Sequence, residues 1–389
     1  MGRKGGTAQE RARRLVEVPV RLLAMLGAAV GLLLAAATFR SSSAASPGDH
    51  QRAFGRLEVT SSSAGGPSAV HASTIVRCTD GRLLAAFFGG SREGAGDVAI
   101  WISSRSRWGG PWSAPAVLAK VSDEAHWNPV LFLAPDARTL WLHFKVGDHI
   151  PTWRTYAMRS SDCGRSWSDA REVVPGDESG GRGCVKNKPL VTAAPDGALV
   201  CGASSELADW VAFADVSLDN GETFERTRAV GSGDGASPGL IQPALWESRA
   251  KPGYVSMLLR SDDGHVHRAD SSDGGRSFGP AYSTNLPNNN SGLDLVLLRR
   301  DVLVLAYNPV AGNWAARYPL RLAISFDNGR SWPRALDVET EPGEFSYPAL
   351  IADRGGRAFH LTYTWNRRKI MHVQMSLNTL LKLAKSIPA

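Results

Sequence analysis

The sequence of 389 residues predicts an all-β, six-bladed β-propeller, and two observations carry this prediction. The motif Ser-x-Asp-x-Gly-x-[Ser/Thr]-[Trp/Phe] occurs four times, with its aspartates 57, 54 and 54 residues apart. A repeat of about this period fits one four-stranded blade with its loops. The chain is also rich in turn-forming residues, with 40 Gly and 22 Pro. The four copies are residues 160–167, 217–224, 271–278 and 325–332.

Each copy of the motif is interpreted as a hairpin turn between two short strands. Its aspartate is suited to accept hydrogen bonds from N–H groups of the turn, and its glycine to adopt positive φ. The final Trp or Phe is expected to pack as an apolar plug between neighbouring sheets. The motif therefore indicates the fold rather than a catalytic site.

The remaining blades follow from the segments around these copies. Alternating apolar residues predict strands near residues 57–59, 72–76 and 83–88. The segment Trp108-Gly109-Gly110-Pro111-Trp112 lies one period before Asp162 and is interpreted as a degenerate fifth copy. Residues 345–374 are expected to form the sixth blade by pairing with the first strand, because such a closure hides the terminal sheet edges. Residues 377–385 are expected to form a short external helix.

The N-terminus is a separate segment. Basic residues precede an unbroken apolar run over residues 22–39, which is typical of a secretory signal or an uncleaved membrane anchor. Small residues at Ala44-Ala45-Ser46 leave cleavage and secretion open, but the length of the run favours a single-pass anchor with the propeller luminal or extracellular. The expected organisation is a basic tail (1–21), the anchor or signal (22–39), a linker (40–55), the propeller (56–376) and a C-terminal helix or tail (377–389).

The same segment accounts for most of the charge of the chain. Residues 1–45 carry seven Lys/Arg and two Asp/Glu, a net of +5 out of a total of +7. The remainder is therefore too weakly basic to indicate nucleic-acid binding. A local cluster of cations that binds an acidic glycan remains compatible with this charge, and the propeller is expected to be monomeric.

The four cysteines form an even set, which a secretory route would allow to pair. Cys184 and Cys201 flank one expected hairpin and are the best candidates for a disulfide, with buried free thiols as the alternative. No C-x-x-C or other metal-ligand spacing is present, so neither a metal nor a cofactor is expected.

Several short stretches between the repeats resemble those of the sialidase (neuraminidase)-like propellers with BNR or Asp-box repeats, over about residues 57–375. They are His71-Ala72-Ser73, residues 88–94, Trp127-Asn128-Pro129, residues 186–189, Ile241-Gln242-Pro243, residues 286–292, residues 306–309, residues 345–348 and residues 363–367.

The resemblance implies a retaining exo-α-sialidase, a glycoside hydrolase that releases terminal sialic acid. Arg260 and Arg317 match the family's arginines that hold the substrate carboxylate. Tyr347 matches its nucleophile, since sialidases use a tyrosine instead of a carboxylate. Asp97 is the candidate general acid and Glu93 its rival.

The sequence also departs from the best-known sialidases. His71 lies near the place of their first arginine, and Gln242 replaces the glutamate that partners the tyrosine. Arg367 or Arg368 is expected to restore the third positive charge, and Glu206 to serve as the base. These departures keep two alternatives open: a hydrolase or lyase for a uronic-acid glycan, and a non-catalytic carbohydrate-binding propeller.

Further polar residues of the matching stretches are expected to line the same end of the propeller. Arg92 is expected to bind substrate or to orient Asp97. The others are Trp127, Asn128, Lys145, Asn187, Lys188, Asn290 and Asn308.

Overall fold

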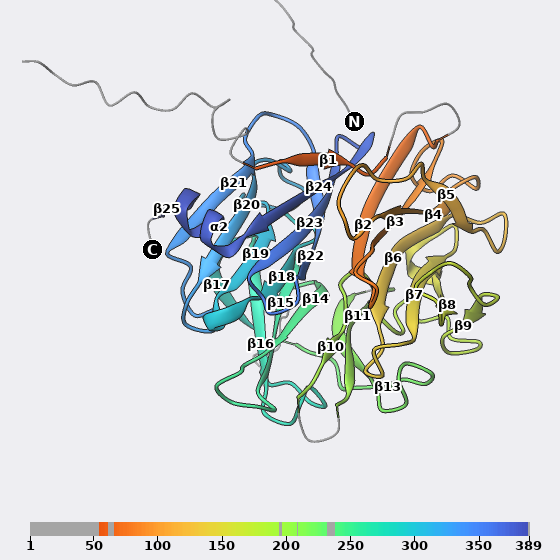
Figure 1. Ribbon diagram of the computed structural model, residues 1–389. Coiled ribbons are helices and arrows are strands. Elements are labelled where there is room, and N and C mark those ends of the chain that lie inside the picture. Colours follow the sequence, from red (N-terminus) through yellow and green to blue (C-terminus); the bar gives the residue numbers. More distant parts are fainter. Residues whose placement is uncertain (1–53, 61–65, 194–196, 208, 232–237, 388–389) are drawn as a thin grey trace, which may run out of the picture. The chain divides into compact units, whose positions relative to one another are not determined.

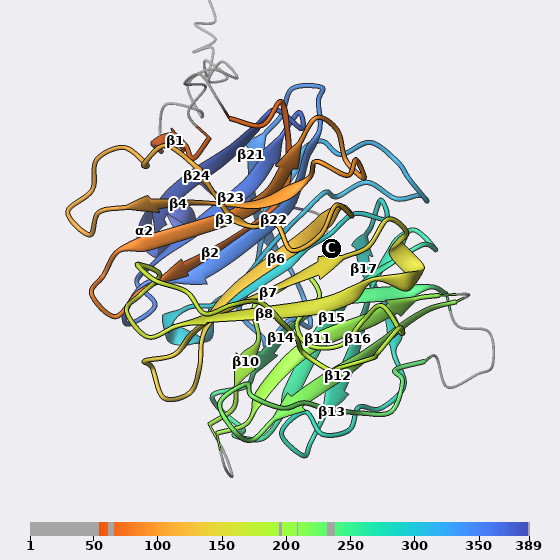
Figure 2. The same cartoon turned by 90° about the vertical axis from the view of Figure 1, so that its right-hand side faces the viewer.

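The computed structural model describes residues 54–60, 66–193, 197–207, 209–231 and 238–387. In this part of the chain six antiparallel sheets succeed one another in chain order (Figure 1). The expectation of an all-β six-bladed propeller is therefore confirmed. Figure 2 shows β2 (Ala69–Arg77) of the first sheet beside both β22 (Phe345–Ala352) of the closing sheet and β6 (His126–Leu133) of the second.

The first three blades each contain four strands. Blade 1 consists of β2 (Ala69–Arg77), β3 (Leu83–Gly90), β4 (Ala99–Arg105) and β5 (Ala116–Ala119). Blade 2 consists of β6 (His126–Leu133), β7 (Leu140–Val146), β8 (Arg154–Ser160) and β9 (Arg171–Glu172), with the short helix η1 (Ile150–Thr152) before β8. Blade 3 consists of β10 (Leu190–Val191), β11 (Leu199–Glu206), β12 (Trp210–Ser217) and β13 (Glu225–Arg226).

The last three blades include the two chain ends of the propeller. Blade 4 consists of β14 (Leu240–Glu247), β15 (Val255–Ser261), β16 (His265–Ser271) and β17 (Tyr282–Pro287). Blade 5 consists of β18 (Asp294–Leu297), η2 (Arg299–Asp301), β19 (Leu303–Tyr307), β20 (Leu320–Ser325), β21 (Arg334–Glu339) and an edge strand, β25 (Lys385–Ser386). Blade 6 consists of β22 (Phe345–Ala352), β23 (Ala358–Trp365), β24 (Lys369–Ser376) and β1 (Arg56–Glu58), and α2 (Leu377–Leu383) follows β24.

The ring is closed by the pairing of β1 with β24, as expected. Leu57 lies opposite His372 in an antiparallel register. Arg56 also reaches blade 5, where its guanidinium donates to Glu339 Oε1 at 2.7 Å and to the Val338 carbonyl oxygen at 2.8 Å. The start of the propeller is thereby joined to its last two blades.

The repeated motifs form the turns between the third and fourth strands of blades 2 to 5. In the first copy the Ser160 hydroxyl accepts the Gly164 N–H at 2.8 Å, and Asp162 accepts from the N–H and hydroxyl of Ser166. Gly164 has a φ of 78°, and an added Cβ would lie 2.7 Å from Leu84 of blade 1. The turn thus requires glycine both for its conformation and for close packing on the neighbouring blade.

The degenerate copy keeps only part of this arrangement. Trp108 is exposed, whereas Trp112 is buried against Ile370 of the closing blade and its indole N–H donates to His372 Nδ1 at 3.3 Å. Trp112 therefore occupies the role of the plug between blades 1 and 6.

The cysteines divide into one bonded and one free pair. Cys184 and Cys201 form the expected disulfide. Cys78 and Cys163 are free and buried. The bonded pair ties the segment before β10 to β11 within blade 3.

The expected N-terminal tail and the anchor or signal segment lie outside the described residues, as does most of the linker. Among the residues that are described, no helix has the length and apolar character needed to cross a membrane.

The antiparallel order of the strands determines where a site can form. In each blade the N-terminal end of the first strand and the C-terminal end of the second lie at the same end of the sheet. His71 pairs with Phe88 in this way, and Trp127 with Lys145. The repeated motifs follow the third strands and lie at the opposite end.

The disulfide supplies a test of the packing of blade 3. The double variant Cys184→Ser/Cys201→Ser should lose about 3 kcal/mol of unfolding free energy, because the bond closes a loop spanning a sequence separation of 17 residues. Denaturant unfolding would measure the loss. The difference should vanish when both proteins are unfolded with a reductant, and equal stability under oxidising conditions would contradict this account.

Candidate active site

The first strands of four blades begin with a bulge near the propeller axis. Their registers shift after His71, Trp127, Ile241 and Ser346. The residue that follows each shift has positive φ although it is not glycine: Ala72 (52°), Asn128 (39°), Gln242 (53°) and Tyr347 (51°). Positive φ is costly for a residue other than glycine and often occurs at functional sites, and bulges re-aim side chains.

Tyr347 and Arg260 form the centre of the site. The Arg260 guanidinium donates to the Tyr347 hydroxyl oxygen at 2.9 Å. It also donates to Gln242 Oε1 at 3.2 Å and to Asn290 Oδ1 at 2.7 Å. Arg260 is buried, so these partners fix its direction. The structure thus brings together four residues that the sequence analysis selected.

Two further arginines are held by one carboxylate that the sequence analysis missed. Glu344 Oε1 accepts from Arg317 Nη1 at 2.9 Å and from Arg367 Nε at 2.7 Å. Burial acts to raise the pKa of Glu344, but Arg367 and Arg317 outweigh it and lower the pKa on balance. The Arg317 guanidinium lies 5.8 Å from the centre of the Tyr347 ring. No motif marks Glu344, which lies directly before β22.

A cavity of about 390 Å³ opens beside this arginine pair. His71, Arg92, Glu93, Glu344 and Arg367 supply its polar lining. Glu93 forms an ion pair with Arg367 across the cavity. Four of these five residues, all except Glu344, were predicted from the sequence to belong to the site.

His71 packs against the nucleophile candidate. Its ring centre lies 4.3 Å from that of Tyr347, and its Nδ1 lies 2.9 Å from the Thr364 hydroxyl. Burial, then Arg367 and Arg317, lower the pKa of His71 well below its ordinary value. The imidazole is therefore neutral near pH 7 and lacks the positive charge of an arginine at this place.

Asp97 holds the turn that carries Glu93. Its two carboxylate oxygens accept the N–H and the hydroxyl of Ser91, each at 2.9 Å. Asp97 is exposed and is not among the residues that line the cavity. A Cβ added at Gly94 of the same turn would lie 3.3 Å from the Trp127 ring. The indole N–H of Trp127 donates to the Gly147 carbonyl oxygen at 2.9 Å.

Lys186 is a buried cation that the sequence analysis did not select, although it begins one of the matching stretches. Its ammonium donates to Asn187 Oδ1, the Leu293 carbonyl oxygen and the Pro348 carbonyl oxygen at 2.6–2.9 Å. It lies 5.7 Å from the centre of the Tyr347 ring. Burial lowers the pKa of Lys186 to about 7.

Glu206 and Lys145 lie near one another at the ends of second strands. Lys145 donates to the Thr155 hydroxyl at 2.6 Å and the Arg182 carbonyl oxygen at 2.9 Å, and burial lowers its pKa to about 7. Burial raises the pKa of Glu206, while Arg260 and Lys145 act in the opposite direction. Glu206 thus interacts electrostatically with the arginine at the centre of the site.

The other polar residues that were predicted to bind substrate make contacts within the protein. The Lys188 ammonium pairs with Asp294 at 2.9 Å. The Asn187 amide donates to the carbonyl oxygens of Gln242 and Pro243, and the Asn308 amide to those of Pro319 and Phe345. Asn128 is buried within its bulge. These residues support the strand ends rather than line the cavity.

Two tryptophans flank Arg260 and were also missed. The Arg260 guanidinium lies 5.3 Å from the ring centre of Trp210 and 5.5 Å from that of Trp314. Trp314 is 63% exposed, and neither residue belongs to a motif. An exposed aromatic ring beside a buried cation can pack against the apolar face of a sugar.

Comparison with solved structures shows the same architecture in proteins of distant sequence. The Hadza microbial sialidase Hz136 superposes with a TM-score of 0.68 at 17% identity, covering 84% of this chain and 69% of that one. The NanB sialidase from Streptococcus pneumoniae gives a TM-score of 0.68 at 11% identity, covering 84% and 71%. A protein of unknown function from Dyadobacter fermentans gives 0.66 at 14% identity, covering 82% and 97%. These similarities show the fold.

No curated protein matches the sequence. The family described as the BNR repeat-like domain matches residues 81–361, which is most of the propeller and more than half of the chain. Together with the repeated turns and the six blades, this match shows that the chain belongs to the BNR repeat-like family.

Proposed function

We propose that this protein is a retaining exo-α-sialidase that releases a terminal sialic acid from glycans, with Tyr347 as nucleophile. The observation that carries the proposal is the hydrogen bond of 2.9 Å from the buried Arg260 to the Tyr347 hydroxyl, within a cluster of cations. A charged donor on this oxygen stabilises negative charge as it develops. The sialidase-like fold of the structural neighbours supports the assignment.

The substrate carboxylate would be bound by the arginines around Tyr347. Arg260 directs one donor at the tyrosine oxygen, while Arg317 and Arg367 converge on Glu344. Arginines suit this role because their donors match the two oxygens of a carboxylate. Glu344 keeps both side chains in place before substrate arrives.

In the reaction, the Tyr347 oxygen would attack the anomeric carbon while the glycosidic oxygen leaves with a proton. Glu206 is the proposed acceptor of the tyrosine proton, since burial raises its pKa and Gln242 cannot act as a base. Water would then hydrolyse the glycosyl–tyrosine bond and regenerate the enzyme.

We assign the general acid to Glu93 and a positioning role to Asp97. Glu93 lines the cavity and pairs with Arg367, whereas both oxygens of Asp97 are engaged by Ser91. A substrate carboxylate on Arg367 would displace Glu93 from this ion pair.

A second candidate function is elimination from a uronic-acid glycan. The observation that favours it is the close packing of a neutral His71 on Tyr347, with the amide of Gln242 where a carboxylate would assist a sialidase tyrosine. Here Tyr347 would move a proton and the glycosidic oxygen would leave, forming an unsaturated uronide.

We also propose that the propeller works in the lumen of the secretory pathway or outside the cell. The Cys184–Cys201 disulfide supports this proposal, because disulfides persist in oxidising compartments. Protease protection of the full chain in sealed microsomes would test it, and digestion without detergent would count against it.

Loss of the tyrosine oxygen tests the nucleophile. The variant Tyr347→Phe should reduce turnover of a fluorogenic sialoside by about 10³-fold or more, because it lacks the oxygen that would form the covalent intermediate. Tyr282→Phe, which removes a surface hydroxyl bonded to Asp270, should retain activity. Full activity of Tyr347→Phe would reject this mechanism. Wild-type binding without turnover would favour a carbohydrate-binding protein, and new ultraviolet absorbance from a uronide would favour elimination.

The two acidic residues can be separated by the leaving group. Glu93→Gln should lower hydrolysis of a natural sialoglycan by about 10²-fold or more but spare an activated aryl sialoside, which needs little protonation. Asp97→Asn should affect both substrates to the same, smaller extent by loosening the turn. The reverse pattern would assign the acid to Asp97.

The pKa of Lys186 predicts how substrate affinity depends on pH. The KM for an anionic sialoside should rise roughly fivefold as the pH passes upward through about 7, because the buried amine loses its proton and its charge. Lys186→Arg should give a flatter profile, since arginine keeps its charge. A pH dependence that persists unchanged in Lys186→Arg would exclude Lys186 as its source.

A further inference from the structure

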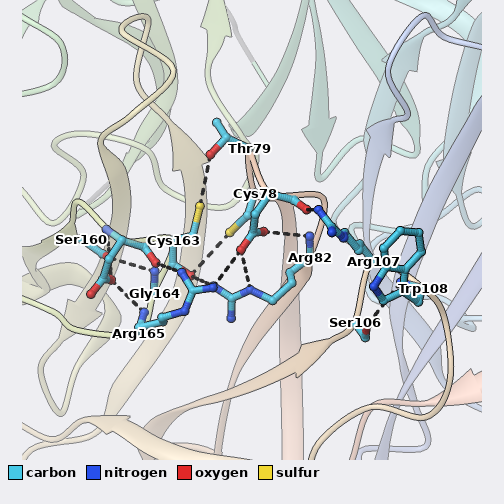
Figure 3. Close-up of polar contacts among 12 residues, drawn as sticks. Cys78, Thr79, Arg82, Ser106, Arg107, Trp108, Ser160, Cys163, Gly164 and Arg165 are labelled. Atoms are coloured by element: carbon cyan, nitrogen blue, oxygen red, sulfur yellow. Dashed lines mark hydrogen bonds and ion pairs between the residues drawn. The ribbon is translucent and has the colours of Figure 1, made fainter.

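Cys78 and Cys163 lie together at the contact between blades 1 and 2, outside the site described above. Cys78 follows β2, and Cys163 lies in the repeated turn after β8. Their sulfur atoms, with a carboxylate oxygen of Asp80, all lie within 4.8 Å of one another. Figure 3 shows the two sulfurs close together, between the Thr79 hydroxyl and the Cys163 carbonyl oxygen. Both thiols are free.

We propose that Cys78 and Cys163 are a site of reversible oxidation that forms a second disulfide, cross-linking blades 1 and 2. Both residues lie in turns at strand ends, where a change of side-chain rotamer does not disturb a ladder. The two thiols are 85 residues apart in the sequence. The repeated turn that holds Cys163 would thereby gain a covalent link to the neighbouring blade.

The surroundings make the two thiols unequal. The Thr79 hydroxyl lies 3.4 Å from Cys163 Sγ. Burial acts to raise the pKa of Cys163, but hydrogen bonds from Thr79, Cys78 and the backbone lower it on balance, whereas burial raises the pKa of Cys78. Cys163 is therefore the better nucleophile and Cys78 the resolving thiol.

Two arginines and one carboxylate lie beside the pair. The Arg82 guanidinium donates to the Cys163 carbonyl oxygen at 2.8 Å and to Asp80, and Arg165 pairs with Asp80 at 3.2 Å. The partly exposed Arg165 side chain attracts an anionic small-molecule disulfide to this surface. The two arginines also compete for the one carboxylate beside the thiols, which disfavours a cation there.

Oxidised glutathione serves as the oxidant in this scheme. The Cys163 thiolate attacks one glutathione sulfur, forms a mixed disulfide and releases one molecule of reduced glutathione. Cys78 then loses its proton and attacks Cys163 Sγ, forming the Cys78–Cys163 bond and releasing a second molecule. Two protein thiols are oxidised and one glutathione disulfide is reduced to two thiols.

The link would lie away from the candidate active site. β2 carries His71, which lines the cavity, near its start and ends at Arg77, directly before Cys78. These seven residues of nearly extended chain separate the site from the thiols by roughly 20 Å. Oxidation should therefore change stability while leaving turnover unchanged.

Peptide mapping of the full-length protein tests the proposal. After incubation with oxidised glutathione and alkylation in denaturant, a peptide linking Cys78 to Cys163 should appear beside the Cys184–Cys201 peptide. In Cys78→Ser, glutathione should remain attached to Cys163, because the resolving thiol is absent. If both thiols of the wild type remain fully alkylated at all glutathione ratios, the proposal fails. Protection by Zn²⁺ bound in a ratio of one to one, without a linked peptide, would instead indicate a metal site.

Thermal unfolding gives a second readout, independent of catalytic activity. Oxidation should raise the Tm of the wild type by about 5 °C, because the cross-link closes a long loop. Cys163→Ser and Cys78→Ser should show no such shift under the same treatment. A shift in both single variants equal to that of the wild type would assign the effect to another group.

Discussion

Closure of the ring is the constraint on which the rest of this structure depends. The pairing of β1 with β24, strengthened by Arg56 and Glu339, holds the sixth blade against the first. Only in a closed ring do the strand ends that carry His71, Arg260 and Tyr347 meet around one axis. These residues are separated by up to 276 positions in the sequence, so no local element could bring them together.

The candidate site combines partly buried charges that pair with one another before any ligand is bound. Glu344 neutralises Arg317 and Arg367, and Glu93 gives Arg367 a second partner. Burying cations without such partners would be costly. A ligand carboxylate that binds Arg367 would therefore replace the Glu93 carboxylate. This exchange couples ligand binding to the position of the turn that carries Glu93.

The fold was largely predictable because its signals are local and repeated. The spacing of Asp162, Asp219 and the two later aspartates determined the blade period, and the turn residues determined the hairpins. The central residues Arg260 and Tyr347 could be predicted because their positions match those of a known family. Glu344 and Trp314 could not be, since neither lies in a repeated copy or in one of the matching stretches. The sequence also could not show which candidate binding residues are already engaged in structural contacts, as Lys188 is with Asp294 and Asn308 with Pro319.

The three acceptors of Lys186 come from different parts of the ring. Asn187 belongs to the segment before β10 in blade 3, Leu293 precedes β18 in blade 5, and Pro348 lies in β22 of blade 6. One ammonium group thus acts as a hub for three blades at the axis, directly beneath the tyrosine ring. Protonation of this single nitrogen therefore makes the alignment of three blades depend on pH.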